Sequence, residues 1–321
     1  MNAKQFLSKM PVPMCGLALG MVSLDLLLSR SYSFYEYSIF AFLSFILIVL
    51  FTLRIITDPH GIVKDLENPA TFGVLPTYTM TLMLLSTYAH GPIGNIALII
   101  WLGAIAASYV FMLFFVKRLF FSFSIEKVFP SLVVIFVGYV VASVTSPEFG
   151  MQELGKILFW SGFTGCLIML PLAVYRVLIV RKIPEPLLPT VAIIAAPANL
   201  ATVGCLTAFG DAPPAIALAI MATVGVVCYV SVMVYMPVML KNTKFYPSYG
   251  ALTFPVVISA VSFRRLGDFY GWSSNGIFAI IRETTVLIAV LIVVYVLIRY
   301  IIFLYRTARG SQGDRTISVK G

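Results

Sequence analysis

Long apolar runs recur along the whole chain, and they constrain its fold more than any other feature of the sequence. A transmembrane helix needs about 20 consecutive apolar residues. Of the 321 residues, 60% are hydrophobic and only 11% are charged, too few charges to cover a water-exposed surface. The sequence therefore predicts an all-α integral membrane protein, with ten spans at residues 11–29, 35–56, 70–89, 93–116, 128–146, 153–180, 187–209, 213–239, 248–266 and 275–303.

The residues outside these spans form short ends and loops, which leave no room for a soluble catalytic domain. We therefore interpret residues 1–321 as a single transmembrane domain. The net charge of +9 does not indicate a nucleic-acid partner, because the basic residues stand at span ends. The two histidines, His60 and His90, lie in predicted loops and the four cysteines have no paired spacing, so no metal or cofactor is expected.

The distribution of Lys and Arg predicts the orientation of the chain in the membrane. If the N-terminus is cytoplasmic, 17 of the 22 basic residues fall on the cytoplasmic side, as the positive-inside rule requires. The other five are Arg30, Lys156, Arg264, Arg265 and Arg282. This bias predicts a multi-pass protein of the cell (inner) membrane with both termini in the cytoplasm.

A proline recurs near the start of every odd-numbered span and reveals an internal repeat. Pro11, Pro69, Pro130, Pro189 and Pro247 are separated by 58, 61, 59 and 58 residues. Two membrane crossings with short loops need about 60 residues, so the repeating unit is a helical hairpin. The five predicted repeats are approximately 1–57, 58–117, 118–180, 181–240 and 241–306, followed by a cytoplasmic tail at 307–321.

A second glycine or proline stands about halfway along each odd-numbered span: Gly20, Pro76, Gly138, Pro197 and Pro255. Proline removes a backbone hydrogen bond and kinks a helix. In a bilayer, such a break is tolerated only where it is buried in protein or lines a water-filled cavity. We therefore expect five broken helices in a quasi-fivefold ring that lines a central pore, backed by five uniformly apolar helices that face lipid. Glycine and proline are also common in membrane helices generally.

Phe254 is a candidate gate for this pore. The residues that precede the other four breaks are Leu19, Leu75, Val137 and Ala196, so Phe254 supplies the one aromatic ring at this position. An apolar ring can close and dewet a narrow constriction. The alternative is that Phe254 is an ordinary core or lipid-facing residue, one of 25 phenylalanines in the chain.

Basic residues mark the two predicted mouths of the pore. One lysine precedes the first proline of each repeat, and together these predict a cationic ring at the cytoplasmic entrance that attracts anions: Lys9, Lys64, Lys127, Lys182 and Lys244. The positive-inside rule alone would also place lysines there. Arg264 and Arg265 are expected at the outer mouth. Weak attraction inside the pore is expected from hydroxyl and amide groups, with candidates Thr71, Thr79, Ser143, Thr190, Asn199, Thr202 and Ser259.

Four of the odd-numbered spans carry segments that resemble a known family: PVPMCGLALGM at 11–21, ATFGVLPTYTM at 70–80, AAPANLATV at 195–203 and YGALTFP at 249–255. They are similar to the TehA / slow anion channel family, which groups bacterial tellurite-resistance and dicarboxylate transporters with guard-cell anion channels of plants. The resemblance implies a ten-helix protomer with its own pore, a homotrimer, a pore-lining glycine at Gly16 and an occluding phenylalanine at Phe254. Gly138 departs from the proline pattern in the fifth span.

Together these features predict an anion-selective channel or facilitator rather than an enzyme. Its expected partners are small inorganic or carboxylate anions and the lipid bilayer. One alternative is a proton-coupled carrier of small anions such as a C4-dicarboxylate, tellurite or sulfite. Coupling of this kind usually needs a titratable residue in the pathway. An intramembrane enzyme, or a purely structural or sensory membrane protein, would be further alternatives.

Overall fold

The computed structural model describes residues 3–32, 39–121, 129–241 and 244–309. Within these ranges every regular element is helical, and eight helices are long and apolar enough to cross a membrane. The sequence-based prediction of an all-helical membrane protein is therefore confirmed. Lys127 and residues 310–321 of the predicted tail lie outside the described ranges.

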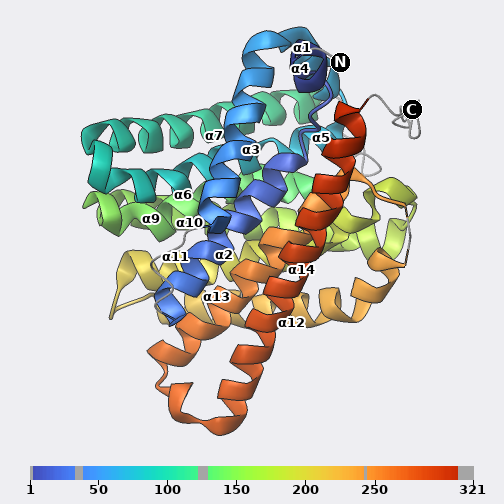
Figure 1. The fold of residues 1–321 in the computed structure, drawn as a ribbon. Coiled ribbons are helices and arrows are strands. Elements are labelled where there is room, and N and C mark those ends of the chain that lie inside the picture. The colour runs from blue at the N-terminus through green and yellow to red at the C-terminus, as the bar shows by residue number, and fades with distance from the viewer. Residues whose placement is uncertain (1–2, 33–38, 122–128, 242–243, 310–321) are drawn as a thin grey trace.

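Figure 1 shows how the helices are arranged. The α-helices are α1 (Ala3–Leu7), α2 (Met14–Tyr32), α3 (Ile39–Thr57), α4 (Pro59–Asp65), α5 (Pro69–Val74), α6 (Pro76–Ile93), α7 (Asn95–Phe121), α8 (Val133–Val137), α9 (Val141–Thr145), α10 (Gln152–Tyr175), α11 (Ala196–Phe209), α12 (Ala215–Leu240), α13 (Thr253–Phe269) and α14 (Gly276–Ala308). Short 3₁₀ helices are η2 (Pro130–Leu132), η3 (Gly138–Val140), η4 (Ser146–Phe149), η6 (Glu185–Ala195), η7 (Pro247–Leu252) and η8 (Trp272–Ser274), and one π-helical turn, η5 (Arg176–Val180), follows α10.

Burial divides the eight candidate spans into two groups. Within Met14–Tyr32, Pro130–Phe149 and Glu185–Phe209, between 67% and 89% of an apolar 18-residue stretch is buried. In the five spans that contain α3, α7, α10, α12 and α14, only 28% to 39% of such a stretch is buried. The first group is rich in Gly, Ala, Ser and Thr, which allow close helix packing, whereas the second group exposes Leu, Ile, Val and Phe.

The interior segments contact one another in a closed cycle. Helix α2 contacts α6, α6 contacts α9, α9 contacts α11, α11 contacts α13, and α13 contacts α2 again. Each interior segment also packs against the long helix that follows it in the chain: α3, α7, α10, α12 and α14 respectively. The two segments outside the eight candidate spans, α5–α6 and η7–α13, thus belong to the same interior layer.

Four interior segments are interrupted near the predicted positions. Helix α5 ends at Val74 and α6 begins at Pro76. The 3₁₀ helix that starts at Gly138 separates α8 from α9. In the last two segments a 3₁₀ helix passes into an α-helix, at Ala196 in one and at Thr253 in the other.

Two of the predicted breaks are wrong in detail. Helix α2 is continuous through Gly20, because a glycine inside a helix keeps its backbone hydrogen bond and costs only about 1 kcal/mol. Pro255 does not kink a helix in its middle. It is the third residue of α13, and proline is tolerated in a first turn, where its missing N–H is not needed. The interruption therefore precedes Phe254 and Pro255.

One end of the molecule brings together the start of α2, the 3₁₀ helix η7 and the end of α14. The Tyr300 hydroxyl donates a hydrogen bond to the carbonyl of Pro247, and Gly250 lies directly against the carbonyl of Pro13. In Figure 1, α1 and the last turns of α14 lie at the same end of the molecule. The start and the end of the described chain are therefore on the same side of the helical bundle.

Candidate functional site

Two cavities lie between the interior segments, and each is lined by all five of them. The larger has a volume of about 190 Å³, and its walls carry three arginines, so we call it the arginine cavity. The smaller, of about 40 Å³, is lined by apolar groups apart from Thr77, and we call it the apolar cavity. The two cavities lie along the middle of the closed cycle of segments.

Phe254 and Leu200 separate the two cavities. Among the described lining residues, these two belong to the walls of both. Both side chains are buried, with 7% of Phe254 and 2% of Leu200 exposed. Phe254 comes from the first turn of α13, and Leu200 comes from the first turns of the neighbouring α11. An aromatic ring and an aliphatic side chain thus form an apolar partition between the cavities.

The backbone of α2 determines where the Phe254 end of α13 lies. The Thr253 hydroxyl donates to the carbonyl of Gly16, 2.9 Å away, and its oxygen is 2.8 Å from the carbonyl oxygen of Gly250. A Cβ atom on Gly20 would overlap the side chain of Thr253 and lie 3.1 Å from the Phe254 nitrogen. Gly20 is therefore a close-contact residue, since any larger residue would push the first turn of α13 away.

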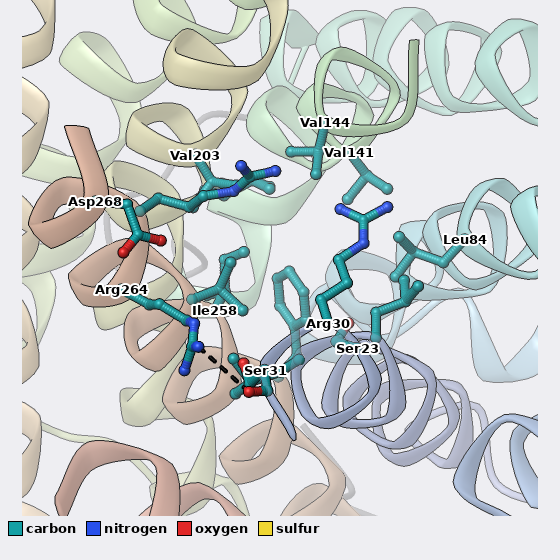
Figure 2. A pocket seen from close by; sticks show the side chains of 16 residues that line it. Ser23, Arg30, Ser31, Leu84, Val141, Val144, Val203, Ile258, Arg264 and Asp268 are labelled. Atoms are coloured by element: carbon teal, nitrogen blue, oxygen red, sulfur yellow. Dashed lines mark hydrogen bonds between the residues drawn. The ribbon is translucent and has the colours of Figure 1, made fainter. Parts of the chain in front are cut away.

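The arginine cavity concentrates positive charge (Figure 2). Arg30 comes from α2 and extends towards Val141 and Val144 of α9. Arg264 and Arg265 come from α13, together with the carboxylate of Asp268. One Nη of Arg264 donates to the carbonyl of Ser31 at 3.5 Å, which links α13 to α2. These groups give the wall of the cavity three guanidinium groups and one carboxylate.

The structure brings most of the predicted pore residues to the cavities. Residues on the wall of the apolar cavity are Gly16, Gly138, Pro197, Phe254 and Pro255. Arg264 and Arg265 line the arginine cavity. Gly20 and Pro76 line neither cavity, and they act through packing and helix initiation instead.

The predicted lysines of the cytoplasmic mouth are exposed where they are described: Lys9, Lys64, Lys182 and Lys244. None of them lines either cavity, so any effect on a permeating anion would act over a longer range.

The hydroxyl and amide candidates line neither cavity. The expectation that they face the pore is therefore wrong at the arginine cavity and at the apolar cavity. Several of them have partners within the helical layer instead. Thr202 donates to the carbonyl of Ala198, and the Asn199 amide donates to the Ser259 hydroxyl and to the carbonyl of Gly225.

Many cavity residues were not identified from the sequence, and Leu200, Arg30 and Ser23 illustrate why. Leu200 lies three residues after Pro197, so it shares a helix face with a predicted pore residue, and this spacing could have identified it. Arg30 was treated only as a topology signal, although it falls on the same predicted side as Arg264 and Arg265. Ser23 resembles any other serine in a membrane helix and carried no signal.

Three charged residues within the predicted spans, Asp25, Arg282 and Glu283, lie outside the cavities and have partners. The carboxylate of Asp25 accepts a hydrogen bond of 2.6 Å from the Tyr88 hydroxyl and one of 3.3 Å from the backbone of Ala41. Arg282 and Glu283 form an ion pair of 2.9 Å, and Glu283 also accepts a hydrogen bond from Tyr32. These contacts connect α2, α3, α6 and α14 near one end of the molecule.

Comparison with known proteins agrees with this architecture. No curated protein sequence matches the chain. A family model described as voltage-dependent anion channel, SLAC1, matches residues 9–301. This range includes both cavities and all five interior segments. Such membership implies a multi-pass membrane protein with anion channel or transporter activity. The chain therefore belongs to the voltage-dependent anion channel (SLAC1) family.

Proposed function

We propose that this protein is an anion-selective channel or facilitator in which each protomer has its own pore, closed by Phe254. The observation that carries the proposal is the position of Phe254 between two cavities that are lined by all five interior segments. A path along the middle of these segments would pass from one cavity to the other only by displacing this ring or its neighbour Leu200.

The proposed pore requires ten membrane crossings. Eight of them are the candidate spans, and α5–α6 and η7–α13 would supply the other two from the interior layer. The closed cycle of contacts supports a quasi-fivefold ring of five helical hairpins. Broken segments are tolerated at this depth because they would be buried in protein and line the pore.

The chemistry of the cavities suits weak and reversible passage of anions. The apolar partition holds no fixed charge, so an anion would not be trapped in the narrowest part of the path. The guanidinium groups lie in the wider arginine cavity, where they raise the local anion concentration. The exposed lysines would act similarly at the opposite, cytoplasmic mouth.

The distribution of charge and the family resemblance support a membrane location, a topology and an oligomeric state for the protein. The positive-inside rule supports insertion in the cell (inner) membrane with both termini in the cytoplasm. The shared end of α1 and α14 agrees with an even number of crossings. The resemblance to bacterial and plant relatives supports a homotrimer, with one pore in each protomer.

A proton-coupled carrier of small anions, such as a C4-dicarboxylate, tellurite or sulfite, is a second candidate function. The observation in its favour is Asp268, the one carboxylate among the described residues that line the cavities. Such a group could exchange a proton with solvent while an anion occupies the same cavity. Against a carrier, the partition between the cavities contains no titratable group.

Anion flux into liposomes distinguishes the two functions. Purified protein is reconstituted, and chloride, nitrate and malate fluxes are measured with and without a pH gradient. A channel moves anions down their own gradients, and its flux responds to membrane potential without needing a pH gradient. Uptake that occurs only with a pH gradient would reject the channel and favour the carrier.

A further inference from the structure

Three buried polar atoms without hydrogen-bond partners gather at the arginine cavity. Nine buried side-chain atoms of the described residues have no partner, and three of them are Ser23 Oγ, Ser31 Oγ and one Nη of Arg264. All three belong to residues that line this one cavity. Ser23 is only 6% exposed, so bulk water does not replace the missing partner. Native proteins pair the great majority of their buried polar groups, and a cluster of unpaired ones needs an explanation.

The charges around the cavity are also unbalanced. Arg30, Arg264 and Arg265 face one carboxylate, that of Asp268. Arg30 and Arg265 line the same cavity, so their like charges repel each other. The remaining walls are largely apolar, from residues such as Leu84 and Ile258, and low-polarity walls strengthen the field of fixed charges. An anion in this cavity would relieve the repulsion and supply acceptors for the unpaired donors.

We propose that the arginine cavity is a binding site for an anion that carries two or more oxygen atoms on one centre, a carboxylate or an oxyanion. The free Nη of Arg264 and the hydroxyls of Ser23 and Ser31 donate to its oxygens, while Arg30 and Arg265 contribute charge. A planar guanidinium matches two oxygens on one centre and makes paired hydrogen bonds with them. A halide ion has no such pair, so the site prefers oxygen anions over chloride.

This binding site rests on the proposed function, because anions must be able to enter the cavity from one side of the membrane. The site then holds an anion on the Arg264 side of Phe254, next to the partition. It therefore determines which anions are concentrated there before they pass the ring.

Anion binding is measured on the full-length protein in detergent micelles. The thermal unfolding midpoint is followed as sodium acetate, sodium nitrate or sodium chloride is added at equal ionic strength. We expect half-maximal stabilisation at concentrations about tenfold lower for acetate and nitrate than for chloride, the effect of one further charge-assisted hydrogen bond. Equal concentrations for all three anions would overturn the proposal.

Arg264→Lys tests the geometry of the site, because it keeps the charge and removes the planar fork. The variant is expected to bind acetate and nitrate about tenfold more weakly, while chloride binding changes less than about threefold. Arg306→Gln, which removes an exposed charge at the far end of α14, is the matched control and leaves all three affinities unchanged. If the Arg264→Lys variant kept the wild-type preference for acetate and nitrate over chloride, the role assigned to Arg264 would be contradicted.

Ser23→Ala provides a test that does not depend on a charged residue. It removes one of the unpaired hydroxyls at little cost in packing, so the variant is expected to fold and to bind acetate several-fold more weakly. Unchanged acetate binding would exclude Ser23 from the site. Flux into liposomes is measured in parallel. If anions cross the liposome membrane but the protein binds oxygen anions no better than chloride, the binding site is rejected and the channel is retained. If the protein prefers oxygen anions in the binding assay but no flux occurs, the channel is rejected and the binding site is retained.

Discussion

The hydroxyl of Thr253 donates a hydrogen bond of 2.9 Å to the backbone carbonyl of Gly16. This bond connects α2 to the residue immediately before Phe254, at the point where η7 passes into α13. Since Gly16 itself lines the apolar cavity, the bond lies beside the proposed pore. The position of the Phe254 ring thus depends on a side-chain contact between the first and the last interior segments.

Thr253→Val removes this hydrogen bond while keeping the shape of the side chain. We expect the free energy of unfolding to fall by about 1 kcal/mol, the usual net value of a buried hydrogen bond. We also expect higher basal anion conductance, because the first turn of α13 is less tightly held. Thr253→Ser keeps the hydroxyl and is the control. Thermal unfolding and bilayer currents that are identical for the valine variant and the wild type would reject the coupling.

Gly20→Ala places a methyl group where Thr253 and the Phe254 backbone already lie. The first turn of α13 must shift, so we expect a loss of about 1–3 kcal/mol in stability, as in other overpacked cores. Anion conductance should change in the same variant. Gly103→Ala in α7 is the matched control, because a Cβ there meets nothing within 4 Å and alanine favours the helix. If both variants kept wild-type stability and conductance, Gly20 would have no role in placing α13.

Leu200→Ala shortens the second side chain of the partition. The gap beside the Phe254 ring widens, so we expect anion conductance above that of the wild type but below that of a variant without the ring. Leu291→Ala, on an exposed part of α14, is the control for loss of a leucine. Single-channel recording in planar bilayers provides the comparison. A conductance at or below the wild-type value would show that Leu200 does not limit the path.

Neutralising the exposed lysines Lys9, Lys64, Lys182 and Lys244 to Gln tests the proposed cytoplasmic mouth. The anion conductance is expected to fall at about 0.01 M salt, where charges act over roughly 30 Å, and to approach the wild-type value at about 1 M, where the range is roughly 3 Å. Lys156→Gln, predicted to lie on the opposite side, is the control. An equal deficit at both salt concentrations would argue against an electrostatic role.

Much of the architecture could be predicted from the sequence because two patterns carry it. Long apolar runs predict membrane helices, and small residues with recurrent Gly and Pro predict which helices pack inside. The burial of Met14–Tyr32 and Glu185–Phe209 agrees with that reasoning. The number of crossings stays a prediction, since eight helices meet the length and composition expected of a membrane span.

The details that were wrong or missed depend on three-dimensional contacts. A glycine can mark a break, as at Gly138, or a close approach between helices, as at Gly20, and the spacing is the same in both cases. Likewise Arg30 and Arg265 are more than 200 residues apart in the chain, so their meeting in one cavity depends on how α2 and α13 pack. Local sequence patterns carry no record of such pairs.

The central claim is that the Phe254 ring closes a pore, and anion current through Phe254→Ala tests it most directly. Wild type, Phe254→Ala and the control Phe114→Ala, whose ring is 59% exposed on α7, are reconstituted in planar bilayers under a chloride gradient. We expect a large rise in chloride conductance for Phe254→Ala alone, with a reversal potential that still indicates anion selectivity. Wild-type conductance in Phe254→Ala, in protein that remains folded, would contradict the claim.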